Sequence, residues 1–345
     1  MVQSGIPLGT SFFPLNFEVK KSARELFAEP SMPATFAGLT ERSLFHEPWW
    51  LDITTGGNWA LAVVENDGEV IAEMPYSLHR KGLWRISTQP PLTRTLGPVI
   101  KPAKKPTDQE WRRRIGIAGE LIAKLPSCAV VQQTLDTRIA EAVAFALQGF
   151  TVSASFTLKI PPGRSEEHVW TDMRANTRNV IRRAAERLTA REMHDADRFV
   201  DFYDANLERR KRGNVYGSRM MRELLGEVLK RKAGMLLGAF AADGSLAAEI
   251  ALVWDKTTMY YLLSSRAEDS HSGSIALLLW IAIRAARERD LTFDFDGIPN
   301  MNLLTFLSGF GGTPAQRLMV ERIRGDYAVM RTIRRSARRY VTGEA

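Results

Sequence analysis

The sequence predicts an α+β protein of two domains, each a mixed, mostly antiparallel sheet flanked by helices. Three observations point to this fold class. The chain has 345 residues, more than a single compact core usually holds. The same order of helices and strands can be drawn twice along it. The segment Pro161-Pro162-Gly163 separates the two passages, because proline and glycine end helices and strands. We therefore expect two sheets of like construction, one on each side of this segment.

The first passage, up to residue 160, predicts a short helix, three strands that turn back on one another, and two helix–strand units. Asn66-Asp67-Gly68 joins two of the strands and predicts a tight hairpin, because such residues tolerate the left-handed backbone of these turns. Asp108 is placed to cap a helix, and Gly149 to end the next one. The expected elements are helix 45–53, strands 59–64, 70–78 and 83–88, a proline-rich loop 89–106, helix 108–124, strand 129–135, helix 138–148 and strand 150–160.

The second passage follows the same order, although the residues themselves do not repeat. Helices are expected to dominate residues 165–232, and Ala242-Asp243-Gly244 joins the first two strands after them. The expected elements are strands 235–241, 246–254 and 258–265, helix 274–289, strand 292–296, a short helix near 302–308, strand 315–323 and a C-terminal helix to about residue 340.

The composition is that of an ordinary globular protein, with 45% hydrophobic and 25% charged residues, which excludes wholesale disorder and a coiled-coil rod. The single cysteine, Cys128, cannot form an internal disulfide and favours a reducing compartment. Residues 1–21 carry no basic segment followed by an apolar run, and the apolar stretch 275–286 is shorter than the roughly 20 residues that a membrane span needs. We expect a cytoplasmic protein without a transmembrane segment.

The chain is basic, with 47 lysines and arginines against 39 acidic residues and a formal net charge of +8. Residues 1–160 hold 17 basic and 15 acidic residues, whereas residues 161–345 hold 30 and 24. A basic half attracts anionic partners such as nucleic acid, CoA phosphates, nucleotide sugars or a membrane surface, but charge does not choose among them. The basic tail at 331–339 indicates a flexible basic end or peripheral contact with a membrane surface, rather than a specific site.

Four short segments stand out in order along the chain. They are FHEPWWL (45–51), QPPLTRTLGP (89–98), RANTRNVIRRA (174–184) and FDFDG (293–297) followed by FGG (310–312). Taken together, they resemble segments of the Fem-type aminoacyltransferases and of related GNAT-like acyltransferases, which contain two GNAT domains in tandem. One departure stands between Phe306 and Phe310, where such sequences usually carry a lysine or arginine and this chain has Leu307, Ser308 and Gly309.

The resemblance implies an N-terminal extension at 1–44, a first GNAT-like domain at 45–162 on the acceptor side, and a second at 163–345 that binds the donor, catalyses the reaction and ends in a basic helix. It implies an N-acyltransferase that moves an acyl group from acyl-CoA to a small-molecule or cell-envelope-precursor amine bound between the domains. Two alternatives stay open. The basic second half fits an aminoacyl-tRNA donor, and the uncharged segment 307–309 fits a non-catalytic pair of GNAT domains that binds RNA or an anionic glycan.

The strand expected at 258–265 and the residues after it are candidates for binding the donor. The resemblance implies that this strand parts from its neighbour and hydrogen-bonds the acyl chain or pantetheine. The start of the next helix would receive phosphates, because helix N-termini present free N–H groups and the positive end of a dipole. An ordinary helix cap explains the same residues, so both interpretations stay open. The candidates are Leu263, Ser265, Arg266, Ser270, Ser272, Gly273 and Ser274.

Three acids and a tyrosine are candidates for acid–base catalysis. Alternation along strand 292–296 places Asp294 and Asp296 on one face, where either could deprotonate an incoming ammonium. Alternatively, Asp296 caps a turn and Asp294 pairs with an arginine. Glu249, within an apolar strand, is another candidate base and is either exposed at an edge or buried with a partner. Tyr261 could protonate a leaving group, or it packs in the core.

The helix that opens the second half carries two rows of arginines, each spaced four residues apart. Such rows suit a phosphate backbone or a diphosphate group, although a solvated helix face explains them equally well. One row is Arg174, Arg178 and Arg182, which with Trp50 are the candidates for substrate binding, and the other is Arg183, Arg187 and Arg191.

Other chemistries fit less well. The five histidines show no HExxH or similar ligand spacing, so no metal site is expected. There is no GxSxG elbow and no GxxxxGK[ST] loop. Cys128 lies in an expected apolar strand, where a thiol is usually inert. His271, in the candidate phosphate loop, is the only histidine worth testing.

Overall fold

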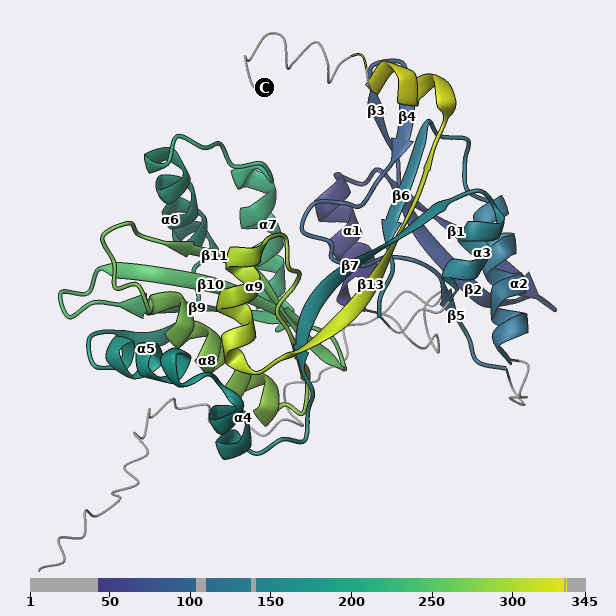
Figure 1. Ribbon diagram of the computed structural model, residues 1–345. Helices are drawn as coiled ribbons and strands as arrows, with labels where there is room; N and C mark the ends of the chain where they lie inside the picture. The colour runs from purple at the N-terminus through teal and green to yellow at the C-terminus, as the bar shows by residue number, and fades with distance from the viewer. Residues whose placement is uncertain (1–42, 104–109, 138–140, 332, 334–345) are drawn as a thin grey trace, which may run out of the picture.

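The computed structural model describes residues 43–103, 110–137, 141–331 and 333. Its fold is the α+β fold that the sequence predicts, a large mixed sheet flanked by helices (Figure 1). Helix and strand positions agree with the periodicities in most of the chain. The expected cap Asp108 and the start of the helix expected at 138 lie outside the described residues.

The first half contains the 3-10 turn Leu44–His46, α1 (Pro48–Thr55), β1 (Trp59–Asn66), β2 (Glu69–Ser77), β3 (His79–Lys81), β4 (Trp84–Ser87), β5 (Val99–Ile100), α2 (Glu110–Ala123), β6 (Val130–Thr134), α3 (Ala142–Leu147) and β7 (Thr151–Ile160).

The predicted hairpin between β1 and β2 is confirmed. The two strands pair antiparallel, and Asn66 lies opposite Glu69 at the turn. The two turn residues both have positive φ, 52° at Asp67 and 77° at Gly68. A two-residue turn of this kind needs positive φ at both positions, which aspartate and glycine accept more readily than other residues.

With one strand added, the second half follows the predicted order after residue 163. It contains α4 (Glu166–Asp172), α5 (Ala175–Ala185), β8 (Thr189–Met193), α6 (Ala196–Arg209), α7 (Ser218–Lys230), β9 (Gly234–Phe240), β10 (Leu246–Trp254), β11 (Thr258–Arg266), α8 (Ser274–Glu288), β12 (Thr292–Asp294), α9 (Met301–Leu307), the 3-10 turn Ser308–Phe310 and β13 (Thr313–Ile323). Residues 325–331 after β13 are helical.

The strand β8 corrects the expectation that residues 165–232 are mainly helical. In this strand Ala190 and Met193 are buried and Thr189 and Arg191 are exposed, and it pairs with β9 at the edge of the sheet. Five residues with an arginine and a glutamate give little periodic signal, as is usual for a short edge strand. The helix α5 therefore ends before Arg187, and Arg191 lies on β8, so the second row of arginines does not follow one helix face.

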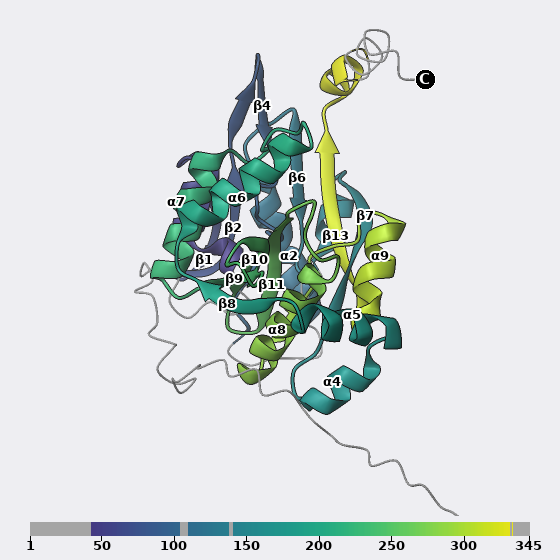
Figure 2. The same cartoon turned by 90° about the vertical axis from the view of Figure 1, so that its left-hand side faces the viewer.

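The two halves exchange their last strands. In the first half β4 pairs parallel with β6, and in the second β11 pairs parallel with β12. The strand beside β6 is β13 from the second half, whereas the strand beside β12 is β7 from the first. β7 and β13 also pair with each other along most of their length and run as a ribbon between the halves (Figures 1 and 2).

This exchange joins what the sequence predicts as two sheets. Ten strands form one sheet in the order β3-β4-β6-β13-β7-β12-β11-β10-β9-β8, and β1, β2 and β5 form a second sheet of three strands. The division of the chain near residue 162 stays a prediction, since β13 belongs to the second half by sequence and lies among first-half strands. Within the described residues, no helix combines the length and apolar character needed to cross a membrane.

In the second half, helices cover both faces of the large sheet (Figure 1). α5 and α8 pack against one face, and α6 and α7 cover the other together with α1. α8 is apolar over most of its surface, which is typical of a helix buried on several sides. The strands between these layers are almost entirely buried, so only their ends and edges can carry a reactive site.

The strands β11 and β12 part shortly after they meet, as the resemblance implies. They pair over three residues, from Thr258 opposite Thr292 to Tyr260 opposite Asp294. β12 then ends, while β11 continues from Tyr261 to Arg266. A β-bulge in the β10–β11 pairing lies in the same stretch and bends β11 locally. This parting, defined by Tyr261–Arg266 of β11 and the end of β12, is where the candidate site is built.

Candidate active site

Arg94 reaches from the proline-rich loop of the first half into the parting. Its guanidinium pairs with the carboxylate of Asp296 and also donates to the backbone carbonyl of Leu262 on β11. A guanidinium therefore satisfies a strand carbonyl in the stretch where β12 no longer pairs with β11. The Arg94 side chain keeps 20% of its surface exposed, so it remains accessible to a ligand.

Trp50 holds the loop that carries Arg94. Its indole N–H donates to the hydroxyl of Thr93 at 2.9 Å, and the side chain is completely buried. The ring of Phe45 packs edge-on against Trp50 and also against Tyr260 of β11. The structure thus places Trp50 in the core behind the loop. A contact with substrate, which the resemblance implies, stays a prediction.

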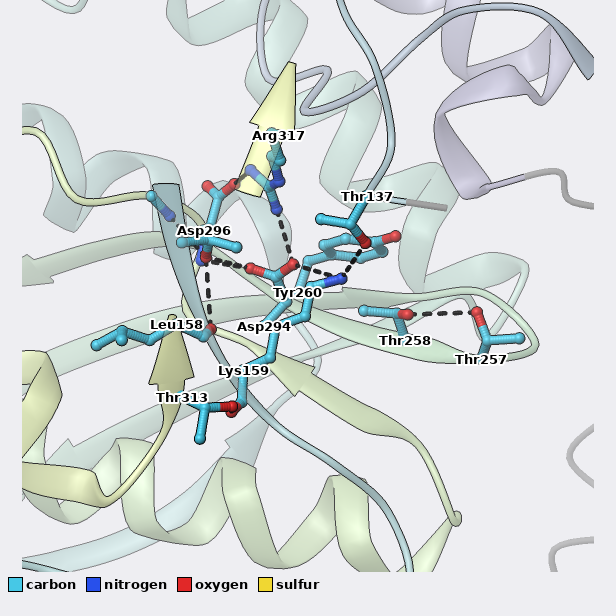
Figure 3. Close-up of polar contacts among 12 residues, drawn as sticks. Thr137, Leu158, Lys159, Thr257, Thr258, Tyr260, Asp294, Asp296, Thr313 and Arg317 are labelled. Carbon is cyan, nitrogen blue, oxygen red and sulfur yellow. Dashed lines mark hydrogen bonds and ion pairs between the residues drawn. The ribbon is translucent and has the colours of Figure 1, made fainter. Parts of the chain in front are cut away.

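Asp294, at the end of β12, is completely buried in a network of hydrogen bonds (Figure 3). Its Oδ1 accepts from the hydroxyl of Thr157 at 2.6 Å and from the backbone N–H of Asp296 at 2.9 Å. Its Oδ2 accepts from Arg317 Nη2 at 2.8 Å and lies 3.5 Å from Lys159 Nζ. Both oxygens are therefore engaged. The three side-chain partners, Thr157, Lys159 and Arg317, come from β7 and β13, the two exchanged strands.

Asp296 lies two residues further on, where the chain leaves β12 with a positive φ of 67°. Its carboxylate is shared between Arg94 and Arg317, whose Nη1 lies 3.2 Å from Oδ1. Burial raises the pKa of Asp296 to about 6, and the two arginines oppose this rise. A carboxyl with this pKa is ionised at neutral pH, yet binds a proton more readily than an exposed aspartate.

Tyr261 is the first residue of β11 beyond its pairing with β12. Burial raises the pKa of its hydroxyl to about 12, and the negative charge of Asp296 raises it further, whereas a hydrogen bond with Ser264 lowers it. The hydroxyl is therefore protonated at neutral pH, as a group that protonates a leaving group must be, and this role stays a prediction.

Glu249 lies on β10, in register with Ser265 of β11. It is completely buried, and neither carboxyl oxygen has a hydrogen-bond partner among the described residues. Burial raises its pKa to about 10, which the charge of Arg198 only partly offsets. The carboxyl is therefore protonated at neutral pH.

Three of the donor-binding candidates, Leu263, Ser265 and Arg266, lie on β11 beside the parting. Leu263 and Ser265 are both buried. The hydroxyl of Ser265 accepts a hydrogen bond from Asn206 of α6 at 3.1 Å, which ties the strand to the helix above it. Any contact of these two residues with a donor is therefore made through their backbone, at the unpaired edge.

The end of β11 and the loop after it carry the donor-binding candidates Arg266 and Ser270. Arg266 donates to the carbonyl of Ser270 at 3.2 Å, and the hydroxyl of Ser270 donates to the carbonyl of Ala267 at 2.7 Å. Arg210, at the end of α6, donates to the carbonyl of Arg266 at 2.9 Å. Two guanidinium groups thus lie at the loop, a position that suits a phosphate.

At the start of α8, Gly273 lies against α5. A Cβ at this position would lie 2.8 Å from Cγ1 of Val180, so packing between the two helices already requires glycine. The N–H of Gly273 donates to the ring of His271 at 3.1 Å. Ser272 is exposed, whereas the buried hydroxyl of Ser274 has no partner among the described residues. Phosphate binding by Ser272, Gly273 and Ser274 therefore stays a prediction.

The first row of arginines has mixed surroundings. Arg178 donates from Nη1 to three carbonyls at the end of α4, those of Trp170, Thr171 and Met173. Arg182 lies over the ring of Trp170. Arg174 precedes α5, and its side chain is exposed without a partner among the described residues. Arg178 thus caps a helix, and substrate binding by this row stays a prediction.

Four residues of the site were not expected from the sequence. Arg94 lies within one of the four resembling segments, but its proline-rich surroundings gave no sign of an ion pair with the other half. The remaining three lie on β7 and β13, which reach β12 only through the strand exchange, and local patterns carry no such information. The four are Arg94, Thr157, Lys159 and Arg317.

Among the described residues, no group of three or more histidine, cysteine, aspartate or glutamate side chains could hold a metal ion.

Comparison with known proteins agrees with this architecture. Residues 171–302 match the family model of the acetyltransferase (GNAT) domain. No curated protein matches the chain in sequence. Solved structures match in fold at low identity. FemX superposes with a TM-score of 0.65 at 12% identity, covering 90% of this chain and 98% of its own.

Two further structures match less closely. The C-terminal domain of a putative lysylphosphatidylglycerol synthetase from Agrobacterium fabrum gives a TM-score of 0.50 at 14% identity, covering 80% of this chain and 88% of its own. L-PGS from Bacillus licheniformis gives 0.50 at 10% identity, covering 81% and 89%. These likenesses concern the fold.

Proposed function

We propose that this chain, a GNAT-fold protein with the tandem architecture of FemX, is an N-acyltransferase that moves an acyl group from acyl-CoA to an amine acceptor held between its two halves. The observation that carries the proposal is the parting of β11 and β12, which contains an ionisable carboxylate and a cation from the other half of the chain. A thioester carbonyl held against the free edge of β11 would lie between these groups. The reaction takes place in the cytoplasm.

Asp296 is the base in this proposal. The amine nitrogen attacks the thioester carbonyl carbon, the C–N bond forms, and the C–S bond breaks. Asp296 takes the proton that the amine loses, and the hydroxyl of Tyr261 gives a proton to the leaving sulfur, after which solvent returns the proton from Asp296 to Tyr261. Glu249 is less suited to this step, because it already carries a proton at neutral pH.

Arg94 supplies the charge that stabilises the developing oxyanion. The segment at 307–309 offers no cation: Leu307 is completely buried, and a Cβ on Gly309 would collide with the side chain of Thr177. Arg94 lies in the parting instead and is partly exposed. A preorganised donor in a site of low dielectric is worth about 100- to 1,000-fold in turnover.

The residues around the loop after β11 fit a donor that carries phosphates. Arg266 and Arg210 supply cations, and the start of α8 supplies backbone N–H groups with the buried hydroxyl of Ser274. Acyl-CoA would bring the activated carbonyl and a thiol leaving group. Glu268 and Asp269 lie exposed in the same loop and weaken the local positive charge.

An aminoacyl-tRNA is the second candidate donor, and the surface of the second half favours it. Arg174, Arg183 and Arg187 are exposed and have no ion-pair or hydrogen-bond partner among the described residues. Unpaired arginines near a helix and its C-terminal end suit the phosphate backbone of a nucleic acid. A cell-envelope precursor with a free amine would then be the acceptor.

A thermal-shift experiment separates these candidates. A donor at 100 times its dissociation constant should stabilise the protein by about 2.7 kcal/mol. We expect acetyl-CoA to raise the melting temperature and total tRNA to leave it unchanged. Arg266→Ser should reduce the rise in melting temperature that acetyl-CoA causes. Arg112→Ser, a change at an exposed arginine of α2, should leave this rise unchanged.

Three other outcomes are informative. Stabilisation by charged tRNA, lost in an Arg183→Ser/Arg187→Ser variant, would replace acyl-CoA by aminoacyl-tRNA as the donor. Salt-sensitive RNA binding without turnover of either donor would favour a non-catalytic binding module. A response to no donor and no RNA would contradict the proposal as a whole.

A further inference from the structure

The hairpin β3–β4 projects from one end of the molecule, and the helical residues after β13 lie beside it (Figures 1 and 2). The ring of Tyr327 packs edge-on against Trp84 at 5.4 Å between centroids, and Arg324 lies over the same indole. Ile86 and Met330 complete a small apolar cluster that joins the two segments. We call this unit, residues 79–87 with 321–331 and 333, the hairpin end.

Large apolar side chains are exposed at the hairpin end. Leu83 occupies the turn between β3 and β4 and is 95% exposed. Val329 and Ile333 lie four residues apart, hence on one face of the helix, and both are mostly exposed. The cluster around Trp84 does not cover them. The turn and the helix of this protruding unit thus each present large aliphatic side chains to solvent.

The hairpin end is also strongly basic. Its sequence holds six lysines and arginines against two acids, and the acids, Glu321 and Asp326, already pair with Arg331 and Arg324. Arg80 lies directly opposite Arg85 in the hairpin. Like charges at such a position destabilise a hairpin, and neither arginine has a carboxylate partner among the described residues. The chain continues from this end with residues 334–345, which include four arginines and one glutamate.

We propose that the hairpin end docks on an anionic lipid bilayer. Leu83, Val329 and Ile333 enter the boundary between headgroups and acyl chains, while the surrounding cations lie over lipid phosphates. A membrane fits better than a nucleic acid, because exposed aliphatic side chains gain nothing from a phosphate backbone, whereas basic segments with apolar tips bind anionic membranes through both effects. The inference does not depend on the proposed acyl transfer.

Vesicle sedimentation with the full chain tests the proposal. We expect binding to phosphatidylcholine vesicles that contain about 30% phosphatidylglycerol, little binding to phosphatidylcholine alone, and weaker binding as salt rises. Leu83→Ser should weaken binding about tenfold, because the buried leucine contribution is lost. Arg80→Ser and Lys81→Ser should each weaken it roughly fivefold.

Matched controls lie elsewhere on the surface. Leu147→Ser removes another highly exposed leucine, from the end of α3, and Lys230→Ser with Lys232→Ser removes two exposed cations at the end of α7. Neither control should change vesicle binding, and unchanged melting temperatures would show that all variants fold. Three outcomes would overturn the proposal: no binding by the wild type, equal binding to neutral and anionic vesicles, or equal losses in the controls. Loss of tRNA binding in the hairpin variants without any vesicle binding would assign the surface to nucleic acid instead.

Discussion

Arg94, from a loop of the first half, and Asp296, after the last residue of β12 in the second, form an ion pair where two strands of the large sheet part. The ion pair links residues that are far apart in sequence, and other residues fix the position of each partner. Trp50 fixes the loop behind Arg94, and Arg317 from an exchanged strand holds the other oxygen of Asp296. Both halves must therefore fold before the site exists.

Replacing Arg94 should lower turnover more than it lowers donor affinity. Arg94→Ala removes the cation near the reacting carbonyl, and we expect a loss of about 100- to 1,000-fold in kcat. Arg94→Lys keeps the charge but loses the forked geometry of the guanidinium. Its kcat should therefore lie between those of the wild type and Arg94→Ala. Steady-state kinetics check this, with Arg112→Ala as the control. Wild-type kcat in Arg94→Ala would remove this residue from the mechanism.

The change Asp296→Asn should lower kcat by about 100-fold or more, because the base is lost while donor contacts remain. The matched control is Asp290→Asn, since Asp290 also has a positive φ, 55°, and is exposed. Asparagine accepts this backbone conformation as readily as aspartate does. Equal activity of the two variants would show that Asp296 is not the base.

The pH profile of turnover should follow the pKa of Asp296. The carboxylate must be unprotonated to accept a proton, so kcat/KM should fall as the pH drops through about 6 and level off above it. Arg94→Ala removes a cation that favours the carboxylate, so this limb should move to higher pH. A profile that stays flat from pH 5 to 8 would argue against Asp296.

Glu249→Gln should change how stability depends on pH. The folded state holds a proton on Glu249 up to about pH 10, while the unfolded chain releases it near 4.5. The unfolded state therefore binds fewer protons in this window, and wild-type stability falls as pH rises. Relative to Glu249→Gln, the wild type should lose more than about 1 kcal/mol between pH 5 and 9.

Thermal or urea unfolding at several pH values measures this difference. Glu223→Gln, at an exposed position of α7, serves as the control and should show no such trend. If Glu249→Gln also keeps full activity, the carboxyl at this position is not the base. A parallel pH dependence in Glu249→Gln and wild type would mean that the carboxyl is ionised in the folded protein.

Arg178→Ala should destabilise the protein by about 1 to 3 kcal/mol, because three carbonyls at the end of α4 lose their donor. Arg183→Ala, at an exposed arginine on the same helix without a partner among the described residues, should leave stability within about 0.5 kcal/mol of wild type. Denaturant unfolding compares them. If the two variants unfold alike, the cap at α4 contributes little.

Much of the fold could be predicted because its signals are local. The Asn66-Asp67-Gly68 turn and the apolar periodicity of α8 depend on neighbouring residues alone, and both are confirmed. The short edge strand β8 was missed, since five residues with charged side chains carry little pattern. The exchange of β7 and β13 has no local signature, because either pairing satisfies the same backbone hydrogen bonds.

In the candidate site, too, the features with a local sequence signal could be predicted and the long-range contacts could not. The aspartates of FDFDG could be singled out by alternation, but their partners could not, because an ion pair between Arg94 and Asp296 is set by how the halves meet. Burial likewise decides the protonation of Glu249, and a sequence does not show that its carboxyl lacks a partner. The acidic residues of the site could thus be predicted from the sequence, whereas the arginines and the lysine beside them are found only in the structure.

The crossed ribbon of β7 and β13 also bears on how the protein could be divided. A gene cut near codon 162 would yield two polypeptides, each missing the neighbour for its penultimate strand: β6 without β13, and β12 without β7. Neither piece should fold soundly by itself, but together they carry every strand of the sheet. Co-expression of the two fragments should therefore restore a working complex, a complementation that an independent pair of domains would not require.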